Sequence, residues 1–223
     1  MKLLAIDTST EACSAALFSD GEIKELWELA PRRHAELVLS MIDTLCADAG
    51  IGVANLDGLA FGRGPGAFTG LRIGAGVIQG IAFGLDLSVV PVSSLAALAQ
   101  GALREAKRER VLSAIDARIG EVYWGAYACG ENRIMRGVLD ECIRLPSEVP
   151  IPEHGPWFGV GSGWQAHGAA LAARLGESLS AFEAARYPRA QDVAVLGVEG
   201  FLRGESVPAE SALPVYLRDQ VVR

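Results

Sequence analysis

Two short stretches decide the fold of this chain: Leu4-Ala5-Ile6-Asp7 near its start and Ser113-Ala114-Ile115-Asp116 near its middle. Each is an apolar strand that stops at an aspartate. Each is followed by a polar turn, a second strand, another turn and a third strand. Because the order, the lengths and the turn positions match, we interpret the chain as two copies of one unit, a three-stranded meander followed by helices. A chance similarity is the alternative, since apolar strands ending in aspartate are common.

The hydrophobic periodicity and the turn residues predict the remaining elements. In the first half we expect strands at 2–7, 13–18, 22–29, 56–61 and 88–92, and helices at 35–49, 69–85 and 94–107. In the second half we expect strands at 111–116, 121–128, 134–142 and 157–160, and helices at 164–175 and 190–202. The predicted domains are an N-terminal lobe of residues 1–107 joined by residues 190–203, a C-terminal lobe of residues 108–189, and a tail of residues 204–223.

Composition excludes several classes of protein. The chain has 223 residues, is 50% hydrophobic and carries a formal charge of −7. Affinity for nucleic acid comes largely from neutralising phosphates, so a chain with few lysines and scattered arginines is a poor candidate to bind RNA alone. The sequence shows neither a signal peptide nor an apolar stretch of about 20 uncharged residues, so we expect a cytoplasmic protein without a membrane span.

The four cysteines, Cys13, Cys46, Cys129 and Cys142, are scattered along the chain. No C-x-x-C pair occurs, so we expect packed or half-exposed free thiols rather than a disulfide framework or a zinc site. His34 opens the predicted helix 35–49, and neither Leu37 nor Val38 supplies the second ligand of a helical metal pair. His34 is therefore predicted to be a surface or helix-start histidine, and no metal site is expected.

A glycine-rich segment, Gly62-Arg63-Gly64-Pro65-Gly66-Ala67-Phe68-Thr69-Gly70, follows the fourth predicted strand. It lacks the Gly-Lys-Ser/Thr ending of a P-loop, so no lysine is available to reach a phosphate. The pattern Gly62-x-Gly64-x-x-Ala67 formally fits a dinucleotide-binding fingerprint, but that fingerprint should close the first strand of a βαβ unit. A Rossmann dehydrogenase is therefore a weak alternative.

The predicted helix after this segment, 69–85, is unusual because it is apolar nearly all round. Arg72 and Gln79 are its only charged or amide side chains, and it contains five glycines. Each glycine costs a helix about 1 kcal/mol relative to alanine, and close approach of another backbone is the natural compensation. Either a neighbouring chain or a neighbouring element of this chain would cover such a helix, and we favour a protein–protein contact.

Polar groups at two predicted strand ends suggest a nucleotide site. Asp7, Thr8 and Ser9 follow the first strand, and Asp116 ends its counterpart in the second half. Carboxylates and hydroxyls in such places hold hydrated magnesium or phosphate oxygens, and the glycine turn at Gly161 and Ser162 is suited to approach a nucleotide closely. The alternative is that these groups only satisfy turn backbone.

The sequence also resembles a known family. It is similar to TsaB proteins, formerly called YeaZ, in four segments spread over the whole chain. These are Ile6-Asp7-Thr8-Ser9, GPGAFTGLRIG at 64–74, IDARIGEVY at 115–123, and VGSG at 160–163. The run at 64–74 is the most specific of them. The resemblance implies an α/β fold of the two-lobed actin/Hsp70/sugar-kinase kind (ASKHA), with a duplicated unit of mixed sheet and helices, in a bacterial cytoplasmic protein.

The resemblance further implies a non-catalytic subunit that helps to make threonylcarbamoyladenosine (t6A) in tRNA. Its partners would be a homologous TsaD-type transferase and a TsaE-type ATPase, with tRNA contacted only through the complex and a homodimer formed when the chain is alone. This chain would require no cofactor, although ATP or ADP with magnesium is possible in the complex. The family's dimer surface would correspond here to Leu37, Val38, Met41, Ile42, Leu45, Gly70, Ile73, Gly74, Val77, Gly80 and Ile81. The alternatives are an ATP-binding or ATP-hydrolysing actin-like enzyme and a glycoprotease-like peptidase.

Overall fold

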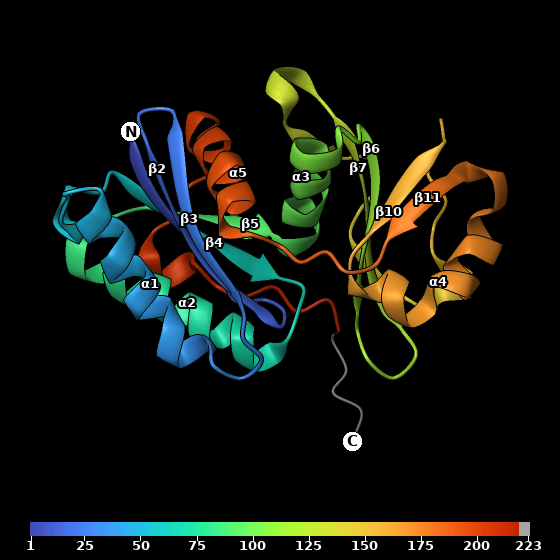
Figure 1. Ribbon diagram of the computed structural model, residues 1–223, viewed down its shortest axis with the longest axis horizontal. Coiled ribbons are helices and arrows are strands. Elements are labelled where there is room, and N and C mark those ends of the chain that lie inside the picture. Colours follow the sequence, from blue (N-terminus) through green and yellow to red (C-terminus); the bar gives the residue numbers. More distant parts are fainter. Residues whose placement is uncertain (219–223) are drawn as a thin grey trace. The chain divides into compact units, whose positions relative to one another are not determined.

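The computed structural model describes residues 1–218, and these form two compact units. Unit 1 comprises residues 1–97 and 188–215, and unit 2 comprises residues 98–187 and 216–218. The boundary therefore falls inside helix α3 (Ser94–Ala106), ten residues earlier than the sequence predicted. The predicted return of the helix near residue 190 to the N-terminal unit agrees with this division (Figure 1).

Unit 1 is built on a five-stranded mixed sheet with the strand order β3-β2-β1-β4-β5. Its strands are β1 (Lys2–Asp7), β2 (Ala12–Ser19), β3 (Glu22–Leu29), β4 (Gly58–Gly64) and β5 (Val89–Ser93). The first three form an antiparallel meander, whereas β1, β4 and β5 run parallel. The carboxyl ends of the three parallel strands therefore meet at one edge, where Asp7 and the glycine-rich segment also lie.

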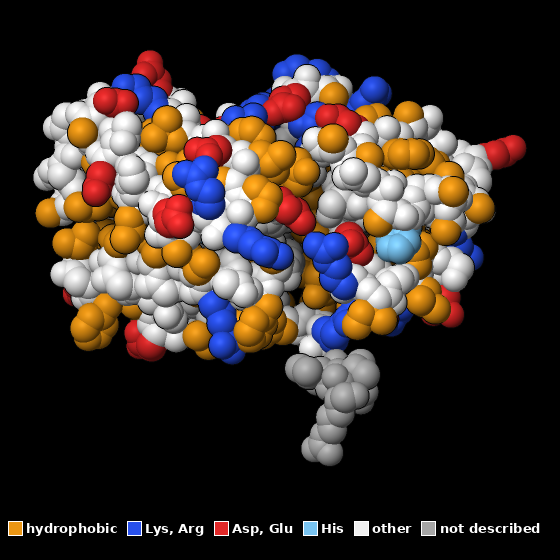
Figure 2. All heavy atoms as spheres, turned by 60° about the horizontal axis from the view of Figure 1, so that its bottom comes forward, with side chains coloured by type: hydrophobic (Ala, Val, Ile, Leu, Met, Phe, Trp, Pro, Cys, Tyr) orange, Lys and Arg blue, Asp and Glu red, His pale blue; other side chains and the backbone are white. Residues whose placement is uncertain are grey.

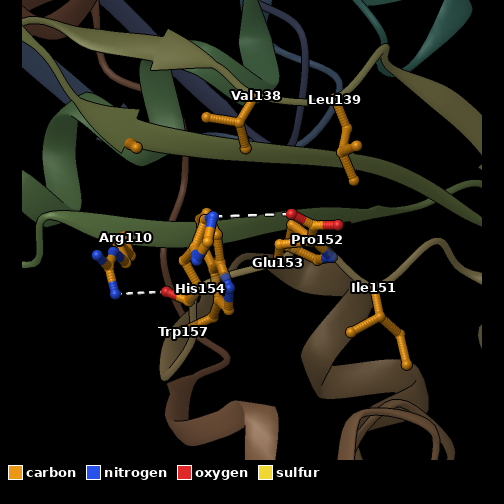
Figure 3. Close-up of a pocket in the computed structure, with 9 residues that line it drawn as sticks. Arg110, Val138, Leu139, Ile151, Pro152, Glu153, His154 and Trp157 are labelled. Carbon is orange, nitrogen blue, oxygen red and sulfur yellow. Dashed lines mark hydrogen bonds and ion pairs between the residues drawn. The ribbon is translucent and has the colours of Figure 1, made fainter.

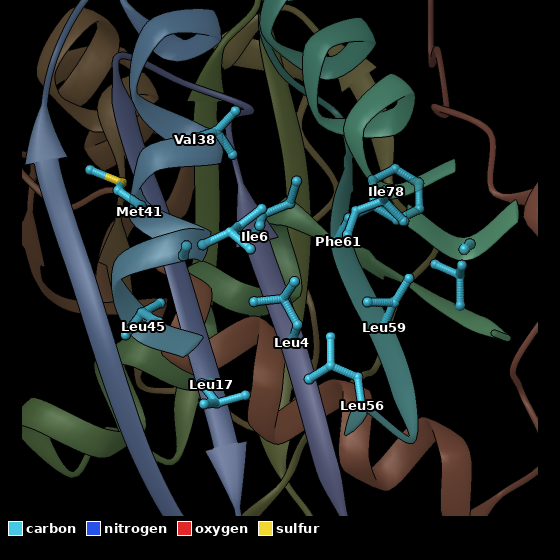
Figure 4. Close-up of a cluster of buried hydrophobic side chains, with 14 of the residues drawn as sticks. Leu4, Ile6, Leu17, Val38, Met41, Leu45, Leu56, Leu59, Phe61 and Ile78 are labelled. Atoms are coloured by element: carbon cyan, nitrogen blue, oxygen red, sulfur yellow. The ribbon is translucent and has the colours of Figure 1, made fainter. Parts of the chain in front are cut away.

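Helices cover both faces of this sheet because β1 is apolar on both sides. Leu4 and Ile6 point to one face, where they pack with α1 (His34–Asp48) and α2 (Phe68–Leu85), as Figure 4 shows. Leu3 and Ala5 point to the other face, which α5 (Ala190–Leu202) covers. A strand buried on both faces reads as a continuous apolar run, which is why Lys2–Asp7 could be predicted.

Unit 2 repeats the same connections in a sheet of order β11-β10-β6-β7-β8, with β9 also paired to β7. Its strands are β6 (Arg110–Asp116), β7 (Val122–Cys129), β8 (Met135–Gly137), β9 (Cys142–Arg144), β10 (Trp157–Val160) and β11 (Leu179–Glu183). β6 pairs antiparallel with β7 and parallel with β10, as β1 does with β2 and β4. Helix α4 (Ser162–Leu175) corresponds to α2. The predicted duplication is confirmed in strand order and direction.

Unit 2 departs from the prediction in three places. The single strand expected at 134–142 is split, because β8 and β9 pair with opposite ends of β7 and leave residues 138–141 between them. Strand β11 was not predicted; it lies at the edge of the sheet and is mostly exposed, so it lacks a buried apolar pattern. Between β9 and β10 the chain forms only a 3-10 turn where unit 1 has helix α1.

Residues 204–215, predicted as part of a tail, belong to unit 1. Val207 forms a bridge with Val89, and the Val215 N–H donates to the Arg63 carbonyl at 2.8 Å. Residues 216–218 of the predicted tail belong to unit 2, and residues 219–223 lie outside the described residues. The short 3-10 helices are η1 (Val53–Asn55), η2 (Glu131–Arg133), η3 (Pro146–Glu148), η4 (Gly176–Ser178) and η5 (Ala209–Ser211).

A buried carboxylate fixes the start of α5 to the meander of unit 1. Glu25 of β3 has a side chain only 7% exposed. It accepts from Arg189 Nη2 at 2.6 Å and from Arg189 Nε at 2.9 Å, and also from the backbone N–H and the side-chain amide of Gln191. Both Arg189 donors share the oxygen Oε2, and such charge-assisted hydrogen bonds are directional, so they set where α5 begins relative to the sheet.

We predict that Glu25→Ala lowers the free energy of unfolding by roughly 3 kcal/mol, because it removes a carboxylate that accepts from a partly buried guanidinium. Glu28→Ala is the matched control on the same strand. Glu28 is 44% exposed and pairs with Arg33 at the surface, so its loss should cost less than about 1 kcal/mol. Urea denaturation of both variants measures the difference. Equal effects would show that Glu25 does not anchor α5.

Candidate functional site

The turn after β1 is buried, although it consists of polar residues. Asp7, Thr8, Ser9 and Thr10 are at most 6% exposed. Asp7 Oδ1 accepts hydrogen bonds from the Ser9 N–H at 3.0 Å and from Ser9 Oγ at 2.8 Å. Thr8 Oγ1 donates to the Gly70 carbonyl at 2.8 Å. The turn therefore satisfies much of its own polarity and that of the start of α2.

The glycine-rich segment covers this turn at a distance that leaves no room for side chains. A methyl group on Gly66 would stand 2.2 Å from the Ser9 carbonyl oxygen, and one on Gly70 would stand 2.0 Å from the Thr8 carbonyl oxygen. On Gly74 it would stand 2.5 Å from Thr8 Oγ1. The segment contains these glycines because two backbones touch here.

His34 contacts the same turn. Its ring is buried, and Nε2 lies 2.9 Å from the Thr10 carbonyl and 3.2 Å from the Ala12 carbonyl, so it carries the proton and donates to both. It does open α1, as predicted, but it is not at the surface. The imidazole ties the first turn of α1 to the turn between β1 and β2.

Asp7 is the most perturbed group in this site. Burial raises the pKa of its carboxyl from 3.8 to about 6, and the two hydrogen bonds from Ser9 offset only part of that shift. Its second oxygen, Oδ2, has no hydrogen-bond partner among the described residues, and neither has Oγ of the neighbouring Ser94. A methyl group on Gly62 would lie 1.9 Å from Asp7 Oδ2 and 3.5 Å from Ser94 Oγ.

The second-half candidates lie together in unit 2. The Asp116 N–H donates to Ser162 Oγ at 3.1 Å, and Asp116 Oδ1 accepts from the Arg118 N–H at 2.9 Å. Gly161 has φ +106° and caps α4, and a methyl group there would stand 2.4 Å from the Ala114 carbonyl oxygen. His167 Nε2 lies 3.7 Å from Asp116 Oδ1. No sequence signal pointed to His167, because 51 residues separate it from Asp116.

Asp7, Thr8 and Ser9 thus belong to unit 1, whereas Asp116, Gly161 and Ser162 belong to unit 2. Within its unit each group is assembled as a strand-end turn. A nucleotide site shared by the two groups stays a prediction. The two strand ends already differ in one respect, because the Asp116 side chain is 21% exposed and Asp7 is fully buried.

Helix α2 has two faces of opposite character. The inner face, with Gly70, Gly74 and Ile78, packs on β1 and β4. On the outer face, a methyl group added to Gly76, Gly80 or Gly84 would meet nothing within 4 Å beyond the helix's own backbone, and the surrounding side chains are largely apolar. The apolar ones are the exposed Phe68 and Phe83, with Phe83 84% exposed, and the half-buried Ile73, Val77 and Ile81, which also pack against the core. The polar Thr69, Arg72 and Gln79 lie on the same face. Figure 2 turns this side of unit 1 forward, and hydrophobic side chains are scattered there among backbone and polar groups.

The predicted interface set must therefore be corrected. Six of its members are buried inside unit 1 and present no surface: Val38, Met41, Ile42, Leu45, Gly70 and Gly74. Five reach the surface, with Gly80 exposed and the others half-buried: Leu37, Ile73, Val77, Gly80 and Ile81. The error arises because an apolar stripe marks both a core face and a docking face, and only packing distinguishes them.

Helix α2 is also the one helix in residues 1–218 that is long and apolar enough to cross a membrane, judged by length and composition alone. Its mean hydropathy is 1.3 over 18 residues, and a third of them are buried. Core helices of soluble proteins pass the same test, and α2 packs on a sheet. The sequence predicted that a neighbouring chain or element would cover this helix, and within the described residues its outer face is exposed.

The cysteines are free, as predicted, with Cys13 and Cys46 buried and Cys129 and Cys142 half-buried. Burial raises the pKa of Cys13 to about 11, and the nearby Asp7 adds to the shift, so this thiol is not nucleophilic at neutral pH. Among the described residues, no three His, Cys, Asp or Glu side chains gather as a possible metal centre.

Comparison with known proteins identifies the family. The family model described as TsaD, tRNA N6-adenosine threonylcarbamoyltransferase, matches residues 27–223. The tRNA threonylcarbamoyladenosine biosynthesis protein TsaB of Escherichia coli K12 is 43% identical over 99% of this chain and 96% of its own length. The protein of the same name from Haemophilus influenzae is 40% identical over 99% of this chain and 95% of its own. The chain belongs to the TsaB family.

Solved structures agree with this assignment. YeaZ from Pseudomonas aeruginosa is 46% identical and superposes with a TM-score of 0.91, covering 97% of this chain and 99% of that one. A second structure, described as an uncharacterized protein with similarity to peptidase YEAZ from the same organism, has a TM-score of 0.90. TsaB-family membership and the duplicated 3-2-1-4-5 sheet order confirm the predicted actin-like fold class.

The two faces of α2 in this TsaB-family chain give opposite predictions for one substitution. Gly70→Ala should lower the free energy of unfolding by about 1–3 kcal/mol, because the new methyl group overlaps a backbone oxygen. Gly80→Ala should raise it by about 0.5–1 kcal/mol, because alanine is the better helix former and the space is open. Urea denaturation tests both. A stabilising Gly70→Ala would mean that α2 does not touch the Thr8 carbonyl.

The buried carboxyl predicts a pH dependence. The folded chain holds the Asp7 proton up to about pH 6, whereas the unfolded chain releases it near pH 3.8, so stability from this group falls as pH rises through that interval. Asp7→Asn keeps the acceptor for Ser9 and cannot ionise. At pH 7.5 we expect the variant to be more stable than the wild type by roughly 2–3 kcal/mol, with the gap closing near pH 4. A stability difference between Asp7→Asn and the wild type that does not change with pH would show that the pKa of Asp7 is not raised in the folded chain.

Proposed function

We propose that this chain is a non-catalytic subunit of the machinery that makes t6A in tRNA, and that it acts by binding a TsaD-type transferase. The outer face of α2 is the observation that carries the proposal. That face carries the exposed Phe68 and Phe83, Arg72 is its one charged side chain, and it has glycines at every fourth position over which no described element of unit 1 packs. Family membership indicates the pathway, since the relatives are named for t6A biosynthesis.

A related chain is a suitable partner for such a face. The transferase family model matches this chain over most of its length, so a TsaD-type protein is expected to carry an equivalent of α2. Two such helices would pack closely where glycines let their backbones approach, with larger apolar side chains on either side filling the grooves. The same geometry would allow two copies of this chain to associate through α2 when no transferase is present.

The chemistry of unit 1 favours a supporting role over catalysis. The strand-end carboxylate Asp7 is enclosed by Gly62 and Ser94, and its neighbours Thr8 and Ser9 are engaged with α2 and with the turn itself. A catalytic or phosphate-binding carboxylate must reach its substrate. For these groups to do so, the loop at 62–70 would have to separate from the turn.

The net charge of −7 supports an indirect relation to tRNA. A subunit without a dense basic surface would reach the phosphate backbone through its partner. In this proposal a TsaE-type ATPase joins the complex, and any ATP or ADP with magnesium belongs to the assembly rather than to this chain alone. We expect the chain and these partners to work in the cytoplasm.

Gly80→Arg tests the interface directly. The site is open, so the variant should fold normally, yet an arginine there would prevent close helix contact. We expect at least a tenfold weaker association with the TsaD-type protein of the same organism, measured by sedimentation or calorimetry. Leu202→Arg is the control, because it also adds an arginine at an exposed apolar position of unit 1, outside α2. Gly74→Arg is unsuitable, since it would collide with Thr8.

Two outcomes would overturn the proposal. Unchanged association of Gly80→Arg would remove α2 as the contact surface, and full t6A in tRNA from cells lacking this chain would remove the function. The rival, an ATP-hydrolysing enzyme, predicts that the isolated chain binds ATP with magnesium and turns it over. Calorimetry and a phosphate-release assay on the isolated chain distinguish the two.

A further inference from the structure

The outer side of α2 has one charged side chain near its start and another at its end. Arg72 is exposed in the second turn, where its guanidinium carbon lies 4.0 Å from the centre of the Phe68 ring. Asp86 is the exposed residue that caps the carboxyl end of the helix, and no described residue pairs with its carboxylate. Asp86 follows Arg72 by about four helical turns, so the two charges lie on the same side of α2.

A pocket of unit 2 shows the contrasting case, because its charged groups are engaged with one another. As Figure 3 shows, Arg110 donates to the His154 carbonyl, and Glu153 lies 3.7 Å from the imidazole of His154. Charges that are satisfied within the chain give little indication of a ligand. The carboxylate of Asp86 has no such partner in the described residues, so the ends of α2 are the more informative place.

Helix α1 lies beside α2 on the same face of the sheet and has a similar distribution of charge. Asp43 and Asp48 are exposed in its second half, and neither helix has a basic residue in its last turn. A carboxylate at the carboxyl end of a helix is unfavourable, because the helix dipole stabilises cations there. A cation supplied by another chain would compensate for this placement.

The neighbouring charges of unit 1 leave this polarity in place. At the carboxyl ends of the two helices, Lys24 donates to the last carbonyl of α1 at 3.5 Å, but three exposed carboxylates stand near it. At the start of α1, Arg33 pairs with Glu28 at 2.8 Å and with Glu36 at 3.4 Å, so these charges largely cancel. The outer face of α1 and α2 is therefore cationic at its start through Arg72 and anionic at its end.

We infer that this face binds a second copy of the chain in the antiparallel orientation, with Arg72 of each copy beside Asp86 of the other. The inference rests on the proposed function, because it concerns the same docking face. Gly80 lies near the middle of the face, about 12 Å after Arg72 and about 9 Å before Asp86 along the helix axis. A two-fold axis at Gly80 therefore brings each arginine to within about 3 Å of the level of the other aspartate.

The antiparallel orientation satisfies the charges and the glycines together. Gly76 of one copy then lies across from Gly84 of the other, so the two backbones can approach closely along the contact. In a parallel pair, Arg72 would face Arg72 and Asp86 would face Asp86, and these like charges would repel. An uncharged apolar partner would leave Asp86 without a cation at the end of its helix.

The test is sedimentation equilibrium of the full-length chain and its charge variants at low salt. Arg72→Glu and Asp86→Lys should each weaken self-association at least tenfold, because a two-fold interface contains every contact twice. The double variant, Arg72→Glu with Asp86→Lys, exchanges the two charges and should associate within about threefold of the wild type. Arg203→Glu is the control, since Arg203 is 50% exposed in unit 1 and lies outside α2.

Two results would overturn the inference: a wild-type chain that stays monomeric up to about 0.1 mM, or a double variant that associates no better than the single ones. Gly80→Arg separates this inference from the proposed function. If it dissociates the dimer while the charge variants do not, α2 remains the docking surface and only the antiparallel pairing fails. If the charge variants behave as expected but Gly80→Arg still binds the TsaD-type protein, the proposed function loses its interface and the pairing of copies stands.

Discussion

The contact between the backbone of α2 and the turn after β1 is the constraint on which unit 1 depends. The Thr8 carbonyl lies so close to Gly70 that no side chain could stand between them, and Thr8 Oγ1 bonds the carbonyl of the same glycine. Because of this contact α2 starts directly above the carboxyl ends of the parallel strands. The rotation of α2 follows from it, and so does the choice of residues that face the sheet and those that face outward.

Two properties of unit 1 lie on either side of this contact. On the inner side, the contact holds the turn in which Asp7 is buried beside Gly62 and Ser94, and that burial raises the pKa of the Asp7 carboxyl to about 6. On the outer side, it leaves Gly76, Gly80 and Gly84 exposed beside Phe83. The buried strand end and the exposed glycines thus lie on opposite sides of one contact, and the proposed role of the chain as a binding subunit draws on both.

Much of this arrangement could be predicted from sequence, for reasons that are local. The paired LAID and SAID strands indicated the duplication, and the glycines of α2 fell on two sides of a helical projection. The projection could not show which side faced the sheet, because that depends on contacts with a turn 62 residues earlier. For the same reason, Val38 and Ile42 were assigned to the interface although they are buried in the core of unit 1. It also hid the pairing of Asp116 with His167, and β11 was missed because an exposed edge strand carries little hydrophobic pattern.

The glycines of α2 fall into two sets, which differ in whether a contact within unit 1 compensates for their low helix propensity. Each glycine in a helix costs about 1 kcal/mol relative to alanine, so the five together cost roughly 5 kcal/mol. For Gly70 and Gly74 the packing of α2 on the turn compensates, since a larger residue would force the two apart. Gly76, Gly80 and Gly84 destabilise the helix just as much, but no element in the described part of unit 1 packs against them to compensate. In the proposed complex, a second helix lying close against the outer face would supply that compensation.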